Sequence, residues 1–433
     1  MTIPSDRSAD STMALLRQGY TFISDRCRQL GNDVFRTRLL LTPAVCLQGE
    51  EAARVFYAPD RFTRRRALPM FTFRLLQDKG SVAALDGTAH HHRKRMFLDL
   101  LTPPEAVAGM RASFEAAWRA ALPKWQLQAP LSLHDALRPV LFRAVCDWAG
   151  LPTDEAHTAA HVCEIGAMID HAGAAGPENW WAALLRRRTE RWLREEVIRL
   201  RAEGPGAPGS SPARALAHHR DEHGRLLDAK VAAVELLNIV RPTVAVSRFI
   251  TFAALALHQN PEWRERLARQ DDGPAHWRFV QEVRRLAPFF PAVGGRVLQP
   301  FEWRGQRFRK GEWVILDLYG TDHDGRAWRD PERFDPERFR EWDGSPFNFV
   351  PQGGGDVAVN HRCPGENITI ALTEAAVRFL TRELTYSVPA DQDLSVDLGA
   401  IPALPRSGFV IANIGAVERS AALPVGTGVR PAE

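Results

Sequence analysis

The stretch FVPQGGGDVAVNHRCPGENITIALTEA covers residues 349–375 and runs from an irregular, Gly-rich loop into a helix. Its cysteine, Cys363, lies just before the expected helix, where backbone N–H groups and the positive end of the helix dipole favour a thiolate. A thiolate there suits a metal ligand or a nucleophile. A nucleophile needs a base, and His361 is two residues away, but such local proximity rarely gives a working cysteine–histidine pair. The stretch favours a metal ligand, and it leaves a structural cysteine or a nucleophile open.

Two further motifs precede this loop. The segment FVQEVRRLAP, residues 279–288, contains Glu282 and Arg285 three residues apart. This spacing places both side chains on one face of a helix and predicts an internal ion pair. The segment WRDPERFDPERF, residues 328–339, follows, and its last six residues form an F-x-P-x-R-F pattern that includes Arg338.

A Glu-x-x-Arg helix, a meander with an arginine and then a cysteine loop, in this order, resemble a cytochrome P-450. The resemblance extends from about residue 40 to 415. It implies a mainly α fold, in which a large helical lobe with small β-sheets holds haem b (iron protoporphyrin IX) between a long central helix and the cysteine loop. Cys363 would then be the thiolate ligand of the iron, and Arg338 would complete the ion pair of Glu282 and Arg285. A thiolate ligand favours O–O cleavage by pushing electron density to the iron.

The cysteine loop departs from the common pattern of that superfamily. The usual loop has a Phe seven residues before the cysteine and a basic residue two before it. Here Asp356 and His361 occupy these positions, and Phe349 lies fourteen residues upstream of the cysteine. The pattern PQGGGD....HRC.GE instead resembles the fatty-acid peroxygenase branch, which implies that His361 contacts a haem propionate.

Three consecutive histidines, His90–His92, first suggest a metal site. Adjacent helical side chains point apart, however, so the three cannot converge on one ion. In DGTAHHHRKRMF, residues 86–97, His90 and Lys94 resemble the other propionate-facing positions of the branch. The alternative for both residues is a solvated helix face. The basic run RFTRRRALP, residues 61–69, is interpreted as solvated surface or as a contact with an anionic cofactor.

The apolar helical stretch VELLNIVRPTVAVSRFITF, residues 234–252, carries Arg241 and Pro242 at its centre. Proline inside a helix removes a hydrogen bond and costs about 3 kcal/mol, and a buried, unpaired arginine costs several more. No carboxylate lies three or four residues from Arg241, and Glu235 is expected to face elsewhere. No acid precedes Thr243, so the acid–alcohol pair that relays protons to dioxygen is missing. The partner of Arg241 is either a core carboxylate from another element or the carboxylate of a ligand.

The pair Arg241–Pro242 resembles the signature of the peroxygenase branch. The resemblance implies that Arg241 anchors the carboxylate of a long-chain fatty acid above the haem and that a kink at Pro242 makes room beside the iron. Hydrogen peroxide would serve as oxidant and oxygen source without a reductase, and the substrate carboxylate would act as general acid and base. The expected product is an alpha- or beta-hydroxy acid. The alternatives are a reductase-dependent cytochrome P-450 monooxygenase and a non-catalytic haem-binding protein.

Four further residues are expected to line the substrate pocket. Phe289 and Phe290, in LAPFFPAVGG, resemble substrate-lining positions, although core packing is an equal alternative. Val244 lies beside the anchor on the same helix. Ala83, in LLQDKGSVAALDG, occupies the position where family members often carry Gln, or a His that is associated with decarboxylation. Hydroxylation is therefore favoured, with decarboxylation to terminal alkenes as a side reaction.

Composition and charge argue against several other classes of protein. The chain has 433 residues and a formal charge of +4 that is spread along it, which does not suggest nucleic-acid binding. No segment resembles a secretion signal or reaches the roughly 18 apolar residues of a membrane span. Five widely spaced cysteines form neither a disulfide framework nor a zinc motif, and those other than Cys363 are expected to be buried. A cytoplasmic location follows.

Helical periodicity dominates the chain, which is expected to form one domain over residues 1–420 with a disordered tail over 421–433. A Gly/Pro/Ser-rich surface loop is expected over residues 203–224. The amphipathic segments that predict helices are 106–122, 130–149, 178–202, 229–258 and 276–287. Strands are expected over 36–57 and 384–389, and a hairpin over 301–316.

Overall fold

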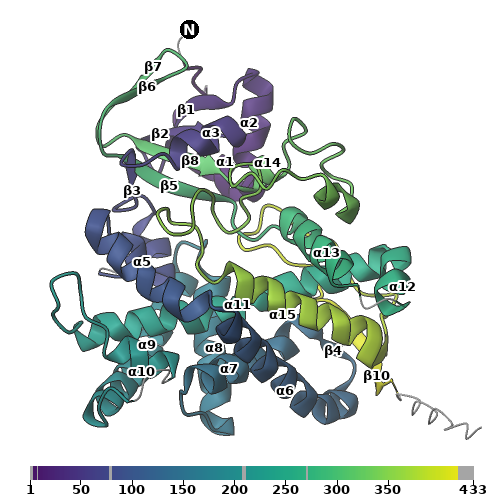
Figure 1. Cartoon of the computed structure of the whole chain (residues 1–433). Coiled ribbons are helices and arrows are strands. Elements are labelled where there is room, and N and C mark those ends of the chain that lie inside the picture. The colour runs from purple at the N-terminus through teal and green to yellow at the C-terminus, as the bar shows by residue number, and fades with distance from the viewer. Residues whose placement is uncertain (1–2, 7, 78–79, 207–210, 270–271, 418–433) are drawn as a thin grey trace, which may run out of the picture.

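The structure is a computed structural model that describes residues 3–6, 8–77, 80–206, 211–269 and 272–417. Figure 1 shows a region built around a sheet, with the N-terminal elements, beside a larger region made of helices. The fold is mainly α, as the sequence predicts. The expected tail, residues 421–433, lies outside the described residues.

The long helices form the larger region. They are α5 (Gly87–Leu101), α6 (Pro104–Gln128), α7 (Leu133–Ala149), α8 (Glu155–Asp170), α9 (Pro177–Ala202), α11 (Ala229–Gln259), α12 (Pro261–Arg269), α13 (Gly273–Leu286) and α15 (Glu366–Arg378). The shorter helices are α1 (Thr12–Gln18), α2 (Phe22–Leu30), α3 (Glu50–Phe56), α4 (Met70–Leu76), α10 (Pro212–Ala217) and α14 (Tyr319–Asp322). One-turn 3₁₀ segments include η2 (Val82–Ala84) and η3 (Pro336–Arg340). All five predicted long helices are present.

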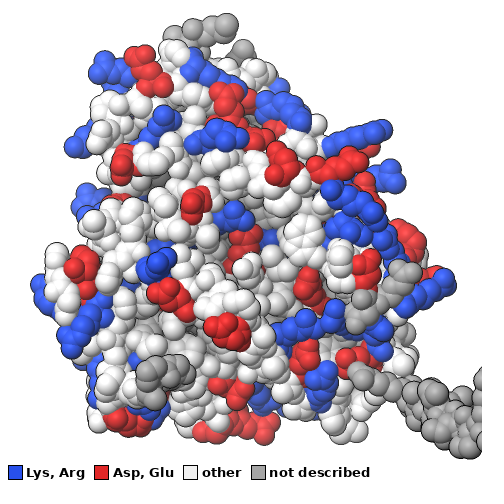
Figure 2. Space-filling view, viewed as in Figure 1, with Lys and Arg blue, Asp and Glu red and all other residues white. Residues whose placement is uncertain are grey.

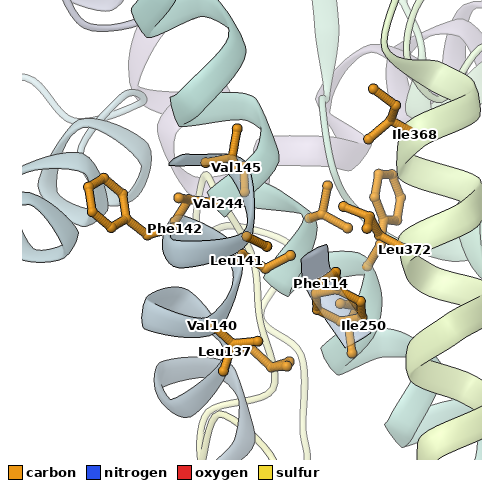
Figure 3. Packing of buried hydrophobic residues seen from close by; sticks show 14 of the residues in the cluster. Phe114, Leu137, Val140, Leu141, Phe142, Val145, Val244, Ile250, Ile368 and Leu372 are labelled. Carbon is orange, nitrogen blue, oxygen red and sulfur yellow. The ribbon is translucent and has the colours of Figure 1, made fainter. Parts of the chain in front are cut away.

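Helix α11 is the centre of the core. Nearly all of its residues from Ala232 to Leu257 are buried and most of them are apolar, a pattern typical of a helix in the core. Figure 3 shows Val244 and Ile250 of this helix among side chains of α7 and α15, including Val145 and Leu372. Each fully buried side chain of this kind contributes roughly 1.5–3 kcal/mol. Within the described ranges, α11 is the one helix long and apolar enough to cross a membrane, and 94% of its most apolar window is buried inside the protein.

The main sheet has the strand order β1-β2-β8-β5-β3, and β2 and β8 pair in parallel while the other neighbours are antiparallel. These strands are β1 (Val34–Leu39), β2 (Thr42–Leu47), β3 (Phe62–Thr63), β5 (Ala292–Val297) and β8 (Trp313–Asp317). A smaller sheet joins β4 (Leu131–Ser132), β10 (Val410–Ala416) and β9 (Leu384–Ser387). The expected hairpin is formed by β6 (Phe301–Trp303) and β7 (Gln306–Phe308).

Three local predictions were wrong. Residues 50–56 form α3 instead of a strand, because Glu50 and Glu51 occupy its first turn and the apolar positions that follow are buried at helical spacing. The expected loop over 203–224 contains α10, which has Pro at its first position and buries one small apolar face. Cys163 is exposed rather than buried.

On the face drawn in Figure 2, basic and acidic side chains are interspersed.

Candidate active site

The cysteine loop is tightly folded against itself. The backbone N–H of Cys363 donates to the carbonyl of Gln352 at 3.1 Å. A Cβ on Gly354 would lie 2.7 Å from the Pro346 carbonyl oxygen, and one on Gly355 would lie 2.3 Å from Asn360 Oδ1. Side chains do not fit at these contact distances, so the run of glycines lets the loop close. The loop delivers Cys363 to the start of α15, whose N-cap is Gly365.

Burial raises the pKa of the Cys363 thiol, although the Gly365 N–H, Lys94 and Arg284 act in the opposite direction. The expectation from the helix end alone, a lowered pKa, was therefore wrong for the free protein. Burial outweighs the helix dipole because a buried thiolate loses its hydration. A bound metal ion reverses this balance, since a coordinating thiol loses its proton. The site suits a metal ligand better than a free nucleophile.

A group of basic side chains lies near Cys363. His90 and Lys94 are buried residues of α5, and Lys94 Nζ donates to the carbonyl of Arg362. The rings of His90 and His361 are 4.0 Å apart between centroids. Arg64 donates to the Gly294 carbonyl at 2.6 Å. We call Arg64, His90, Lys94 and His361 the basic cluster.

Burial disfavours the charged form of each member of the basic cluster. Burial lowers the pKa of His90 to about 4 and that of Lys94 to about 8. Burial, reinforced by Arg64 and His90, puts the pKa of His361 well below its usual value. No ion pair joins the cluster to a carboxylate of the described residues, and the buried His90 Nε2 has no hydrogen-bond partner there. A buried cluster of this kind is complementary to an anion.

These residues fit haem b. Cys363 offers a thiol in a closed loop, and the basic cluster offers donors and positive charge for two propionates. The orphaned His90 Nε2 is the observation that points to a missing partner. The alternative for His90 and Lys94, a solvated helix face, does not hold because both are buried, with 3% of their surface exposed. His91 and His92, in contrast, are exposed.

Arg241 lies on α11 and is buried, with 6% of its surface exposed. Its guanidinium donates to the carbonyls of Leu75 and Leu76 at the end of α4, and to Asn238 Oδ1 at 3.2 Å. Among the described residues, no carboxylate forms an ion pair with it. Burial lowers its pKa to about 9, and nearby Arg186 lowers it further than Glu190 can offset.

Arg241 is linked to Glu235 through an intermediate that the sequence interpretation missed. Asn238 Nδ2 donates to Glu235 Oε2 at 2.9 Å, while Asn238 Oδ1 accepts from Arg241. Glu235 is fully buried, pairs with Arg93 at 2.8 Å and accepts from the Val82 N–H at 2.8 Å. The expectation that Glu235 faces elsewhere holds for direct contact only. Three-residue steps from Glu235 to Asn238 to Arg241 could have indicated the link.

Pro242 and Thr243, the residues after Arg241, remain within the helix. The structure keeps α11 helical through Pro242. The hydroxyl of Thr243 donates to the Ile239 carbonyl at 2.9 Å, so it is used within the helix. Ala83 lies in η2, beside Val82, and this segment is therefore tied to α11 through Glu235.

Two of the other residues expected to line the pocket, Val244 and Phe289, lie in apolar surroundings. Val244 is fully buried and lies near Val145 of α7 (Figure 3). Phe289 stacks on Phe249 of α11 at 4.2 Å between ring centroids. Phe290 is 42% exposed. A role in substrate binding stays a prediction for Val244, Phe289 and Phe290.

The ion-pair network lies behind the cysteine loop, on α13 and η3. Arg285 donates to both carboxylate oxygens of Glu282 at 2.8 Å, and Arg338 Nε donates to Glu282 Oε1 at 3.1 Å. The Asp335 N–H donates to the same oxygen at 2.9 Å. Arg284, the neighbour of Arg285, pairs with Glu366 at the start of α15. The network thus fixes the meander, and Arg284 connects its helix to the cysteine loop.

A family model and curated proteins match this chain. The family model for Cytochrome P450 matches residues 276–398. Abscisic acid 8'-hydroxylase 3 of Oryza sativa subsp. indica is 23% identical over 90% of this chain and 81% of its own length.

Three solved structures are more similar. A mutant of Cytochrome P450SP alpha (CYP152B1) is 46% identical with a TM-score of 0.91, covering 94% of this chain and 100% of that one. Cytochrome P450EX alpha (CYP152N1) with myristic acid is 39% identical, with a TM-score of 0.91 over 96% of this chain and 100% of that one. A mutant of cytochrome P450 OleT in complex with arachidonic acid is 33% identical. Its TM-score is 0.92, and the match covers 97% of this chain and 100% of that one.

These identities and coverages extend over nearly the whole chain, and the residues matched by the family model include the cysteine loop. The cofactor of this family is haem b with a cysteine thiolate ligand. The chain belongs to the cytochrome P450 superfamily, in its fatty-acid peroxygenase branch.

Proposed function

We propose that the protein uses hydrogen peroxide to hydroxylate long-chain fatty acids at the alpha or beta carbon, with no reductase. The observation that carries this proposal is the state of Arg241. It is a buried guanidinium next to an apolar core, and no described carboxylate pairs with it. A fatty acid supplies a carboxylate for the arginine and an apolar chain for the surroundings.

The haem would be held by Cys363 from the loop and by the basic cluster around its propionates. Two propionates would restore the hydrogen bond that His90 Nε2 lacks and favour the charged form of Lys94, raising its pKa. When bound, the haem supplies the iron at which hydrogen peroxide is split and the oxidising power for the C–H bond.

Arg241 would bind the substrate carboxylate with those guanidinium N–H groups that do not already donate to the protein. A guanidinium has five N–H groups, and the carbonyls of Leu75 and Leu76 and the amide of Asn238 take three hydrogen bonds. The Nε–H and one Nη1–H have no acceptor among the described residues. Either of these N–H groups can donate a charge-assisted hydrogen bond to a carboxylate oxygen.

The carboxylate held by Arg241 would also move the proton that peroxide cleavage needs. One of its oxygens accepts a proton from hydrogen peroxide, and the same oxygen returns it to the departing hydroxide, which leaves as water. Thr243 does not serve this purpose, because its hydroxyl is committed to the Ile239 carbonyl. The anchor also fixes which substrate carbons lie nearest the iron, so oxidation falls at the alpha or beta carbon. Ala83 offers no imidazole, and hydroxylation is favoured over decarboxylation.

The test is turnover of a long-chain fatty acid by the holoenzyme with hydrogen peroxide alone, with products resolved by mass spectrometry. We expect alpha- or beta-hydroxy acid from the native protein and a loss of at least about a hundredfold in Arg241→Ala, since one oriented charge pair is removed. Arg248→Ala is a matched control, because it removes another buried arginine of α11. The same fatty acid as its methyl ester should be a poor substrate.

Other outcomes identify the competing functions. Turnover that needs dioxygen and an electron donor, and that survives Arg241→Ala, would assign the protein to the reductase-dependent monooxygenases. Fatty-acid binding without product under either condition would indicate a non-catalytic haem protein.

A further inference from the structure

The outward face of α9 combines exposed aromatic and basic side chains. Trp180 is 71% exposed, Trp181 is 54% exposed and Leu184 is 44% exposed. Positions 180, 184, 187 and 191 recur at i, i+4, i+7 and i+11, which places them in one stripe along the helix. Apolar side chains that form a contiguous exposed patch mark an interaction site more often than single exposed ones do.

Arginines continue this stripe. Arg187, Arg188 and Arg191 are exposed, and no carboxylate of the described residues pairs with them. Other arginines of the same helix do have partners: Arg186 pairs with Glu190 at 2.7 Å, and Arg199 pairs with Glu196 at 2.7 Å. Arg194 and Glu195, further along the same helix, are also exposed and have no ion pair among the described residues. We call Trp180, Trp181, Leu184, Arg187, Arg188 and Arg191 the α9 face.

The short helix α4 extends the apolar end of the α9 face. Asn179 Nδ2 donates to the Phe71 carbonyl at 3.5 Å, which brings the start of α4 beside the start of α9. Met70, at that start, is 53% exposed. Helix α9 itself lies at the outer edge of the helical region (Figure 1).

We propose that the α9 face docks the protein on an anionic lipid surface. Tryptophan is enriched at membrane–water interfaces because its ring is apolar and its N–H is polar. Clustered arginines are drawn to anionic headgroups, and an exposed helical stripe with both features is typical of an interfacial helix. A second copy of this chain is disfavoured as the occupant, since two patches of the same charge repel. An acidic protein partner is the alternative that the experiment separates.

Contacts on the inner side of α9 connect the docking surface to the proposed fatty-acid site. This connection rests on the proposed function. Arg186 donates to the Gln77 carbonyl, directly after α4, while Arg241 donates to the carbonyls of Leu75 and Leu76. The end of α4 is therefore held by α9 from one side and by α11 from the other. Docking through the α9 face brings the segment that holds the carboxylate anchor near the lipid surface, where fatty acids concentrate.

The experiment is co-sedimentation of the holoenzyme with vesicles, without substrate or peroxide. Vesicles of phosphatidylcholine with phosphatidylglycerol are compared with phosphatidylcholine alone, at low and high salt. We expect binding to the anionic vesicles that weakens with salt. The triple variant Arg187→Gln, Arg188→Gln, Arg191→Gln should bind at least about tenfold more weakly. The double variant Trp180→Ser, Trp181→Ser should also lose binding, although its charge is unchanged.

A matched triple variant controls for charge. Arg95, Arg269 and Arg329 have side chains 73%, 78% and 96% exposed and lie outside α9. Changing these three to Gln should leave binding within about twofold. Equal loss in both triple variants would overturn the proposal in favour of unspecific attraction. Absence of vesicle binding by the native protein would overturn it in favour of an acidic protein partner.

Peroxide-driven turnover of free fatty acid should be the same in all these variants, which checks their folding. Because vesicle binding is measured without turnover, failure of the proposed docking and failure of the proposed activity give separate results.

Discussion

Two buried arginines of this protein differ in what neutralises their charge. Arg285 on α13 donates to both oxygens of a fully buried carboxylate, Glu282. Arg241 on α11 is nearly as buried, yet it contacts only carbonyl groups and an amide. The first arginine is complete within the protein. The second retains an unsatisfied charge, and its pKa is lowered to about 9 by burial.

This difference separates a structural charge from a functional one. Removing one member of a complete buried pair strands the other, which costs about 3–5 kcal/mol. Removing a buried charge that has no counterion leaves no opposite charge unpaired, and the burial penalty disappears with the charge. The same substitution at the two positions should therefore affect different properties of the protein.

The largest effect is expected at the complete pair. Arg285→Ala leaves Glu282 buried, with Arg338 as its remaining ion-pair partner. Because Arg338 still pairs with Glu282, we expect the free energy of unfolding to fall by about 3 kcal/mol, the lower end of the cost of stranding a buried charge, measured by urea denaturation of the holoenzyme. A decrease below 1 kcal/mol would contradict the view that the network holds the fold.

Arg241→Ala should give the opposite pattern. Its free energy of unfolding should stay within about 1 kcal/mol of the native value, since the lost hydrogen bonds are offset by the lost cost of burying a charge. Fatty-acid turnover should fall at least about a hundredfold. Denaturation and turnover are measured on the same preparation. A large loss of stability would indicate that Arg241, like Arg285, has a structural role.

The pH dependence of substrate affinity tests the charge of Arg241. The pKa of Arg241 lies at about 9 because burial disfavours its charged form. Its guanidinium is charged below that pH and neutral above it, and a carboxylate binds the charged form. Affinity for a long-chain fatty acid should therefore be constant up to about pH 9 and then fall up to tenfold per pH unit. Affinity for the methyl ester, the control, should not change in this range.

A smaller effect is expected at the link between Arg241 and Glu235. Asn238→Ala removes the amide that accepts from Arg241 and donates to Glu235. Arg241 keeps its contacts to α4 but loses one of its three acceptors. We expect KM to rise about tenfold with kcat within about twofold. An unchanged KM would show that the carbonyls of α4 alone orient the arginine.

The smallest effect concerns the product rather than the rate. Ala83→His introduces an imidazole in η2, which is tied to α11 through Val82 and Glu235. The resemblance to the peroxygenase branch implies that this change raises the ratio of terminal alkene to hydroxy acid. Mass spectrometry of the products measures the ratio, and Ala83→Phe controls for size. An equal shift in both variants would assign the effect to volume instead of the imidazole.

Long periodic elements of this fold were predictable from sequence, and short ones were not. Helix α11 repeats its apolar pattern over 31 residues, whereas α3 has seven residues and α10 has six. In elements of one or two turns, helical and strand patterns are hard to distinguish, and burial against the rest of the protein decides between them.

The candidate site shows a similar limit. Cys363 and Arg241 were identifiable because each stands out against its own segment. The partners of these residues come from distant segments: Lys94 contacts the Arg362 carbonyl, and the ends of α4 and η2 contact α11. Such contacts depend on tertiary structure. The raised pKa of Cys363 likewise results from burial, which the local sequence did not indicate.

The central claim, that Arg241 binds the substrate carboxylate, is tested most directly by a thermodynamic cycle. The dissociation constants of a long-chain fatty acid and its methyl ester are measured for the native holoenzyme and for Arg241→Ala at pH 7.5. We predict that the native protein prefers the acid by about a hundredfold and that the variant shows no preference, a coupling of about 2–3 kcal/mol. The same preference for the acid in both proteins would contradict the claim.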